Sequence, residues 1–242
     1  MKRVAICLLL GGLIVWGGGI GAVGSTESMG SLKLGAQLYD NWLKMTGKTV
    51  EGNHPAYPAE AKKSGSSTWR CKECHGWDYI GKDGRYASGS HYTGIKGLYD
   101  VRTRSGQDLQ QAIAATGTLH DFTEYLTLEE IVSLVRFINE GLIDISVALN
   151  ADGTARGDAE AGKQLYAANC ADCHGADGNA IDFKGDKDGV QGVGYLAVDN
   201  PQESLHKIRW GHPGSDMPSL IADVGLDDAA AINILSYSQT LP

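Results

Sequence analysis

Cysteine is scarce in this sequence, and almost all of it lies in two short segments. There are five cysteines in 242 residues, and Cys7 falls in an apolar amino-terminal segment. The other four lie in the pentapeptides CKECH, residues 71–75, and CADCH, residues 170–174. A structural disulfide framework spreads its cysteines over the fold, so this clustering predicts a different covalent use of the thiols.

Basic residues are also few relative to acidic ones. The chain has 21 Lys and Arg against 29 Asp and Glu, which gives a net charge of −8. A protein that binds nucleic acid needs a basic surface to neutralise the phosphates. We therefore expect no nucleic-acid partner, whereas an acidic surface is compatible with docking to a basic protein.

Long apolar runs are missing after residue 24. Before it, two basic residues precede about 20 residues without a charge, and small residues at Ala22 and Gly24 suit cleavage before Ser25. This pattern predicts an export signal over residues 1–24 and a periplasmic protein. The alternative is an uncleaved membrane anchor, because roughly 20 apolar residues can cross a bilayer.

Glycine, in contrast, is abundant, with 33 residues in the chain. This is about twice the average usage in proteins, and it predicts many loops and turns. A small, loop-rich domain needs something besides side chains to complete its core. A bound prosthetic group would supply that core.

Both pentapeptides have the form C-x-x-C-H, the attachment signature of haem c. The two thiols form thioethers with the vinyl groups of the porphyrin, and the histidine ligates the iron. Zinc would not require a histidine after each cysteine pair, and a thioredoxin-like redox pair would need a βαβ context that is not evident. We therefore predict two covalently bound haem c groups. Their attachment residues are Cys71, Cys74 and His75 in the first copy and Cys170, Cys173 and His174 in the second.

A methionine–proline pair follows the second copy, with Met217 placed 43 residues after His174. The order of helix, pentapeptide, loops, Met-Pro and final helix over residues 157–242 resembles class I cytochrome c. The resemblance implies that His174 and Met217 are the axial ligands of the second haem. Arg209 and Trp210 precede the methionine loop, and their N–H groups are candidates for hydrogen bonds to haem carboxylates.

The first half of the sequence follows the same order. GAQLYDNW, from residue 35, matches GKQLYAAN, from residue 162. Residues 126–141 and 225–240 both begin with acidic residues and continue with apolar residues at helical spacing. The first and last helices of class I cytochromes c cross beside the haem. The resemblance thus implies close helix crossings at Gly35 and Gly162, with Tyr39 and Tyr166 packed there.

The repeat predicts an all-α fold of two tandem cytochrome c domains, each packed around a covalent haem c. The predicted boundaries are residues 1–24 for the signal, 25–142 for domain one, 143–158 for a turn-rich linker and 159–242 for domain two. Because the linker is rich in turns, we expect the relative placement of the domains to depend on the interface between them.

Domain one differs from domain two by an insertion and by its distal ligand. Tyr39 lies 32 residues before Cys71, whereas Tyr166 lies four before Cys170, so the insertion has 28 residues. We expect it to fold over an edge of the first haem. No methionine occupies the position of Met217, and His120 stands there instead, 45 residues after His75. We therefore predict bis-His ligation by His75 and His120. The alternatives for the distal ligand are His91, His54, Met45 or an open site.

An iron with two protein ligands has no open position, so we expect an electron carrier or a cytochrome subunit rather than an enzyme. Methionine ligation raises the haem potential, so electrons would enter at domain one and leave from domain two toward redox protein partners. A more distant resemblance is to dihaem thiosulfate dehydrogenases, but that family uses a cysteine sulfur on its active haem. Outside Cys7, no cysteine here lies beyond the pentapeptides. The remaining alternative is a filament-forming or complex-subunit cytochrome.

Overall fold

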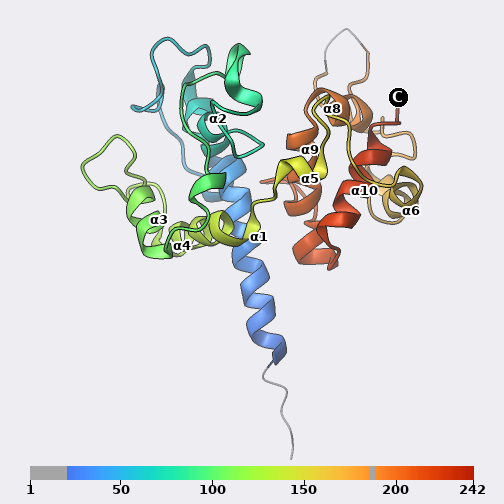
Figure 1. Cartoon of the computed structure of the whole chain (residues 1–242), viewed down its shortest axis with the longest axis horizontal. Helices are drawn as coiled ribbons and strands as arrows, with labels where there is room; N and C mark the ends of the chain where they lie inside the picture. The colour runs from blue at the N-terminus through green and yellow to red at the C-terminus, as the bar shows by residue number, and fades with distance from the viewer. Residues whose placement is uncertain (1–20, 186–188) are drawn as a thin grey trace, which may run out of the picture.

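The computed structural model describes residues 21–185 and 189–242, so most of the predicted signal lies outside the described part. Regular structure in the described residues is helical, apart from three isolated β-bridges. Figure 1 shows two groups of helices, which we call the first half (residues 21–142) and the second half (residues 159–242). This is consistent with the predicted all-α fold.

No helix in the described residues is both long enough and apolar enough to span a membrane.

Short helices separated by long loops make up both halves. The first half contains α1 (Gly21–Thr46), η1 (Gly65–Trp69), α2 (Cys71–His75), η2 (Arg85–Ala87), η3 (Gly89–His91), η4 (Tyr99–Val101), α3 (Gly106–Ile113), α4 (Leu128–Arg136) and η5 (Phe137–Gly141). The helix α5 (Ile145–Ala148) lies between the halves. The second half contains α6 (Ala159–Asn169), α7 (Ala171–His174), α8 (Val193–Asp199), α9 (Pro201–Trp210), η6 (Leu220–Val224) and α10 (Asp228–Ser238).

The helices expected from the acidic first turns are present, and their amino-terminal caps explain where they begin. The Thr127 hydroxyl accepts from the Glu130 N–H, while the Glu130 carboxylate accepts from the Thr127 N–H, which forms a capping box at α4. At α10, the Asp227 carboxylate accepts from the Ala230 N–H. The predicted segments 126–141 and 225–240 are thus confirmed as helical over most of their length.

The two halves contain the same close helix crossing. At Gly35 of α1 an added Cβ would overlap the Ser133 carbonyl of α4, and at Gly162 of α6 it would overlap the Asn233 carbonyl of α10. The tyrosine four residues after each glycine donates its hydroxyl to the carbonyl that follows a pentapeptide. Tyr39 donates to Gly76, and Tyr166 donates to Gly175 at 3.0 Å. Each crossing is therefore joined to the start of the adjacent C-x-x-C-H loop.

Substitution of either crossing glycine tests this geometry. We expect Gly35→Ala and Gly162→Ala each to lower the free energy of unfolding by about 1–3 kcal/mol, because the helices must separate to admit a methyl group. Gly30→Ala is the matched control, since nothing lies within 4 Å of a Cβ at this position of α1. Better helix propensity should make that variant more stable by up to about 1 kcal/mol. Urea denaturation measures all three, and equal stabilities of Gly35→Ala and Gly30→Ala would contradict the crossing.

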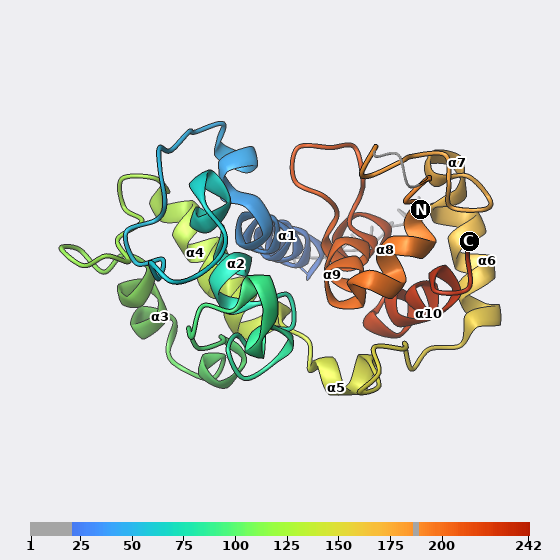
Figure 2. The ribbon, with the colours of Figure 1, turned by 90° about the horizontal axis from the view of Figure 1, so that it is seen from above.

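The halves meet through α1 and α9, which lie side by side in Figure 2. The buried Asp40 of α1 forms ion pairs with Lys207 of α9, at 2.7 Å, and with Arg70 of its own half. The Gln37 side chain donates to the Trp210 carbonyl at 3.2 Å. Interfaces within one chain are often loose, but this one contains a buried, satisfied polar network, so it fixes the relative placement of the halves.

The linker is more ordered than its composition indicates. Ala148, in α5, is fully buried, and Leu149 is 5% exposed. An isolated bridge joins Leu149 to Ala155. The turns predicted in this segment are present, and Ile143, Ala148 and Leu149 pack into the core, while Val147 is exposed.

Candidate functional site

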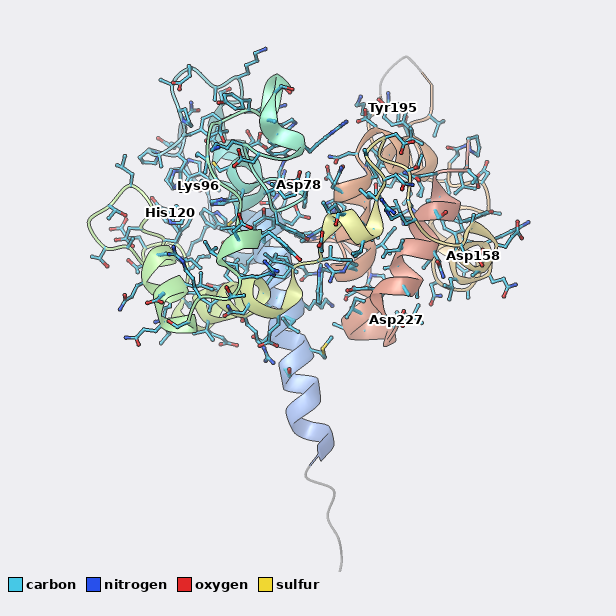
Figure 3. All side chains as sticks on the ribbon, in the orientation of Figure 1. Asp78, Lys96, His120, Asp158, Tyr195 and Asp227 are labelled. Atoms are coloured by element: carbon cyan, nitrogen blue, oxygen red, sulfur yellow. The ribbon has the colours of Figure 1, made fainter. Side chains whose placement is uncertain are left out.

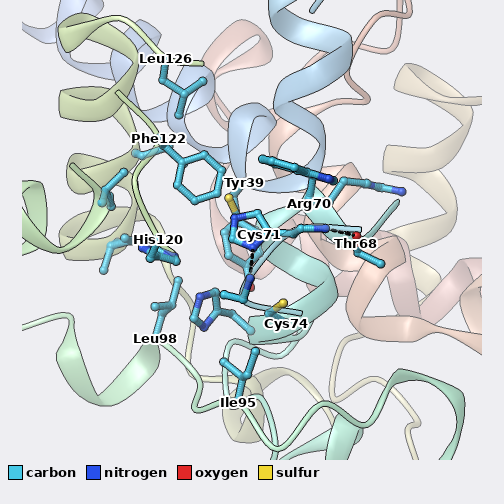
Figure 4. A pocket seen from close by; sticks show the side chains of 17 residues that line it. Tyr39, Thr68, Arg70, Cys71, Cys74, Ile95, Leu98, His120, Phe122 and Leu126 are labelled. Atoms are coloured by element: carbon cyan, nitrogen blue, oxygen red, sulfur yellow. Dashed lines mark hydrogen bonds between the residues drawn. The ribbon is translucent and has the colours of Figure 1, made fainter. Parts of the chain in front are cut away.

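A cavity of about 330 Å³ lies in the first half, and the CKECH pentapeptide forms part of its wall. Cys71, Cys74 and His75 line one side, and His120 lines the wall contributed by the loop after α3 (Figure 4). Most other lining side chains are apolar, including Leu98 and Phe122. This composition suits a flat apolar group that needs a few polar ligands.

The insertion predicted from the repeat covers this cavity. His54, Ala56, Thr68 and Trp69 all come from the inserted segment, and all four line the cavity. The Trp69 indole is held by a hydrogen bond from its Nε1 to the Gly52 carbonyl at 3.2 Å. The insertion therefore shields an apolar chamber from solvent, as would be needed for the expected cover over a haem edge.

His75 is oriented by the backbone so that one ring nitrogen is left for the cavity. Its Nδ1 lies 2.7 Å from the Lys96 carbonyl, which can only accept, so the proton is on Nδ1 and the Nε2 lone pair is free. Burial lowers the pKa of His75 to about 4, which keeps the ring neutral. A neutral imidazole with its other nitrogen bonded to a carbonyl is the usual state of a metal ligand.

His120 has the same arrangement in the loop opposite, and Figure 3 shows it with Lys96 in the first half. Its Nδ1 donates to the Ala112 carbonyl at 2.9 Å, which again leaves the Nε2 lone pair free. The rings of His75 and His120 have centroids 6.3 Å apart. One metal ion bound by two imidazoles at roughly 2 Å each would separate the ring centres by roughly 6 Å. The centroid separation of the pair is therefore compatible with one metal ion bound by both rings.

The other candidates for the distal ligand have different surroundings. His54 lines the cavity, but its Nδ1 accepts from the Ala56 N–H at 3.1 Å, so the neutral ring carries its proton on Nε2. His91 is bonded through Nδ1 to Glu73 at 2.8 Å and does not line the cavity. Met45 packs against the core and does not line the cavity either. The geometry therefore favours His120, although the ligation itself stays a prediction.

The two cysteines of CKECH are free thiols in the wall of the cavity. Burial raises the pKa of both the Cys71 and the Cys74 thiols to about 12. A catalytic or redox-active cysteine needs the opposite shift, toward the thiolate. Neither thiol is in a disulfide. The two thiols are therefore unpaired and placed at the cavity, whereas their raised pKa speaks against a redox-active cysteine pair.

The second half places its pentapeptide in the same local structure but leaves it more open. Gly76 and Gly175, which follow the two histidines, have φ values of 83° and 80°, a conformation that favours glycine. Cys173 is exposed, and the Nδ1 of His174 is buried without a hydrogen-bond partner. Met217 is half-buried in the loop after α9. No hydrogen bond joins His174 to Met217 among the described residues, so their axial pairing also stays a prediction.

Arg209 and Trp210, the candidates for haem carboxylate contacts, differ in their availability. The Arg209 guanidinium donates to Asp228 at 2.7 Å and to the Gly141 carbonyl at 3.0 Å. The Trp210 indole is 2% exposed, and its Nε1 has no acceptor within the described residues. An indole N–H buried without a partner is costly, so an acceptor from outside the chain would stabilise it. Trp210 therefore fits its predicted role better than Arg209.

Sequence reasoning gave no role to His206, which the structure places at the centre of the interface between the halves. It is 1% exposed, and its ring bonds to Tyr79 and to Ala36, both in the first half. One signal of its burial is its place in α9, where it follows the buried Leu205 and precedes the buried Arg209 and Trp210. Its hydrogen-bond partners lie more than 120 residues away in the sequence, so they could not be predicted from the residues around His206.

Comparison with known proteins bears on the second half. Residues 157–237 match the model of a family described as cytochrome c oxidase, cbb3-type, subunit III. No curated protein matches the chain, and no solved structure matches it. The family match agrees with the helical fold and with the CADCH pentapeptide, and it supports a c-type cytochrome. A cytochrome c domain in this segment implies a covalently bound haem c and suggests electron transfer.

Proposed function

We propose that this chain is a dihaem c-type cytochrome that transfers electrons in an exported redox chain. The first haem is attached at Cys71 and Cys74 and ligated by His75 and His120. The second is attached at Cys170 and Cys173. The observation that carries the proposal is the pair of imidazoles that line the cavity of the first half, with ring centroids 6.3 Å apart and each Nδ1 bonded to a backbone carbonyl.

Bis-His ligation leaves the iron without an open coordination position, so the group exchanges electrons and does not bind substrate. The chain's part is to hold both ligands before the group is bound. The Lys96 and Ala112 carbonyls fix the tautomer and orientation of the two rings. The apolar wall and the insertion exclude water, which limits the solvent rearrangement that accompanies a change of charge.

Two haems are proposed because the halves share more than the pentapeptide. The glycine crossing, the tyrosine bond to the carbonyl after the pentapeptide, and a positive-φ glycine directly after the pentapeptide are found in both halves. Recurrence of the pentapeptide alone would not bring these packing details with it. They support tandem cytochrome c domains at residues 25–142 and 159–242.

The proposed ligand sets predict the direction of electron transfer within the chain. A methionine ligand at Met217 favours reduced iron more than a second imidazole at His120 does, so the second site has the higher potential. Electrons then pass from the first half to the second. Export to the periplasm remains part of the proposal and rests on residues 1–24; the donor and acceptor are proposed to be redox proteins.

The sulfur-oxidising alternative lacks a comparable support. The enzymes that this alternative resembles have a cysteine sulfur on the active iron. In the described residues every cysteine belongs to a pentapeptide. The lining of the first-half cavity includes His120, which we propose as the distal ligand.

Haem counting tests the proposal directly. We expect two haems per chain in the purified protein, measured by the pyridine haemochrome spectrum against protein concentration. Cys71→Ala with Cys74→Ala, and Cys170→Ala with Cys173→Ala, should each leave one. A single haem in the unmodified protein, or a first-half variant that loses none, would refute the dihaem assignment while leaving the c-type cytochrome domain of residues 157–237 intact.

A further inference from the structure

A histidine of the second half is inserted into a group of aromatic rings of the first. His206 is carried by α9 and is 1% exposed. The rings that surround it lie at centroid distances of 5.1–6.2 Å. They are Trp77, Phe137, Tyr39 and Tyr79, all from the first half. Such a ring contributes packing in several directions at once, and its position allows little displacement of α9.

Both nitrogens of the His206 ring are satisfied across the interface. The Ala36 carbonyl, 3.1 Å from Nε2, can only accept, so Nε2 carries the proton. Nδ1 then accepts from the Tyr79 hydroxyl at 2.8 Å. Burial lowers the pKa of His206 to about 3, which agrees with this neutral tautomer. Loss of either bond would leave a buried polar group without a partner.

One of the surrounding rings is shared with the haem cavity. Tyr39 lines the cavity of the first half, and its ring centroid lies 6.0 Å from that of His206. On the other side, α9 leads directly into the loop that carries Met217. Packed atoms therefore continue from the wall of the first cavity, through Tyr39 and His206, to the helix before the proposed distal ligand of the second site.

We infer that His206 is a positioning residue for electron transfer between the halves. It holds α9 against Tyr39, so that the two haem sites keep one separation and one packed path between them. The inference rests on the proposed dihaem function and adds the residue on which the internal step depends. Its physical basis is that electron tunnelling weakens steeply with distance and with each unfilled gap along the path.

The test is the rate of internal electron transfer after photoreduction of the full-length holoprotein. His206→Gln keeps a donor for the Ala36 carbonyl but removes the ring, and we expect a severalfold lower rate constant. Tyr79→Phe keeps the packing but removes the donor to Nδ1, and we expect a smaller decrease. Lys33→Gln is the control, because it breaks an exposed ion pair with Asp223 across the same interface and touches no ring. Haem content, spin state and both midpoint potentials should be unchanged in all three.

Three other outcomes of these measurements would contradict the inference or the proposed function. Rates equal to that of the unmodified protein in both ring variants would overturn the role of His206. An equal decrease in Lys33→Gln would also overturn it, because docking in general would then set the rate. If His206→Gln fails to fold, Tyr79→Phe decides the question by itself. A single haem per chain would instead refute the proposed function, and with it this inference.

Discussion

We expect His120→Ala to change the proposed first haem site of the oxidised protein from low-spin to high-spin, and to leave the proposed second site unaffected. The expected result follows because the substitution would remove the proposed distal ligand, and the iron would then be five-coordinate or water-ligated. Electron paramagnetic resonance and the visible absorption spectrum of the oxidised holoprotein report the spin state of each haem. Half of the total iron should change, which makes this the largest spectroscopic effect expected of a single substitution.

Three matched variants show whether His120 itself is responsible. His54→Asn and His91→Ala should both remain low-spin, since the Nδ1 of His54 accepts from Ala56 and His91 is bonded to Glu73 outside the cavity. His120→Met should also remain low-spin but raise the potential of the first site, because thioether ligation favours reduced iron. High-spin iron in His54→Asn with none in His120→Ala would assign the distal position to the insertion.

Asp40→Asn lowers the free energy of unfolding by about 3–5 kcal/mol at pH 7, the usual cost of removing one partner from a buried ion pair. The Asp40 side chain is 1% exposed and is bonded to both Lys207 and Arg70. The amide keeps the shape but removes the carboxylate partner of Arg70 and leaves Lys207 with only the longer Glu203 pair, at 3.6 Å. Urea denaturation measures the loss. Lys33→Gln is the matched control, since its exposed pair with Asp223 should contribute less than about 1 kcal/mol.

The same substitution has a defined dependence on pH. Burial alone would raise the pKa of Asp40, but Lys207 and Arg70 overcome this and lower it below its ordinary value. Because the unfolded-state pKa is about 3.9, the carboxylate contributes fully above that pH, and its contribution disappears as the pH falls through the folded-state value. The stability difference between the protein and Asp40→Asn should therefore shrink on acidification. A difference that is independent of pH would assign it to packing instead.

The sequence predicts those parts of the molecule whose causes are local. Helix starts at Thr127 and Asp227 follow from caps and acidic first turns within four residues. Gly35 and Gly162 could be found because the crossing repeats, so each copy supports the other. His120 was found from its register relative to His75, and the structure places it on the same cavity.

Features that depend on distant partners could not be predicted. The Arg209 guanidinium, expected near a haem carboxylate, is bonded to Asp228 and to the carbonyl of Gly141, 68 residues away in the sequence. His206 has its hydrogen-bond partners 127 and 170 residues away. The local pattern around His206 and Arg209 does not identify their partners in the other half.

The burial of Ala148 and Leu149 between the halves, together with the aromatic pocket around His206, affects how this protein can be dissected. A fragment that ended within residues 143–158 would expose that pocket and strip the linker of its packing, and it would tend to aggregate. Expression of isolated halves is therefore a poor way to study one proposed haem site at a time. Cysteine substitutions within the intact chain keep the interface between the halves covered and remove one proposed attachment site at a time.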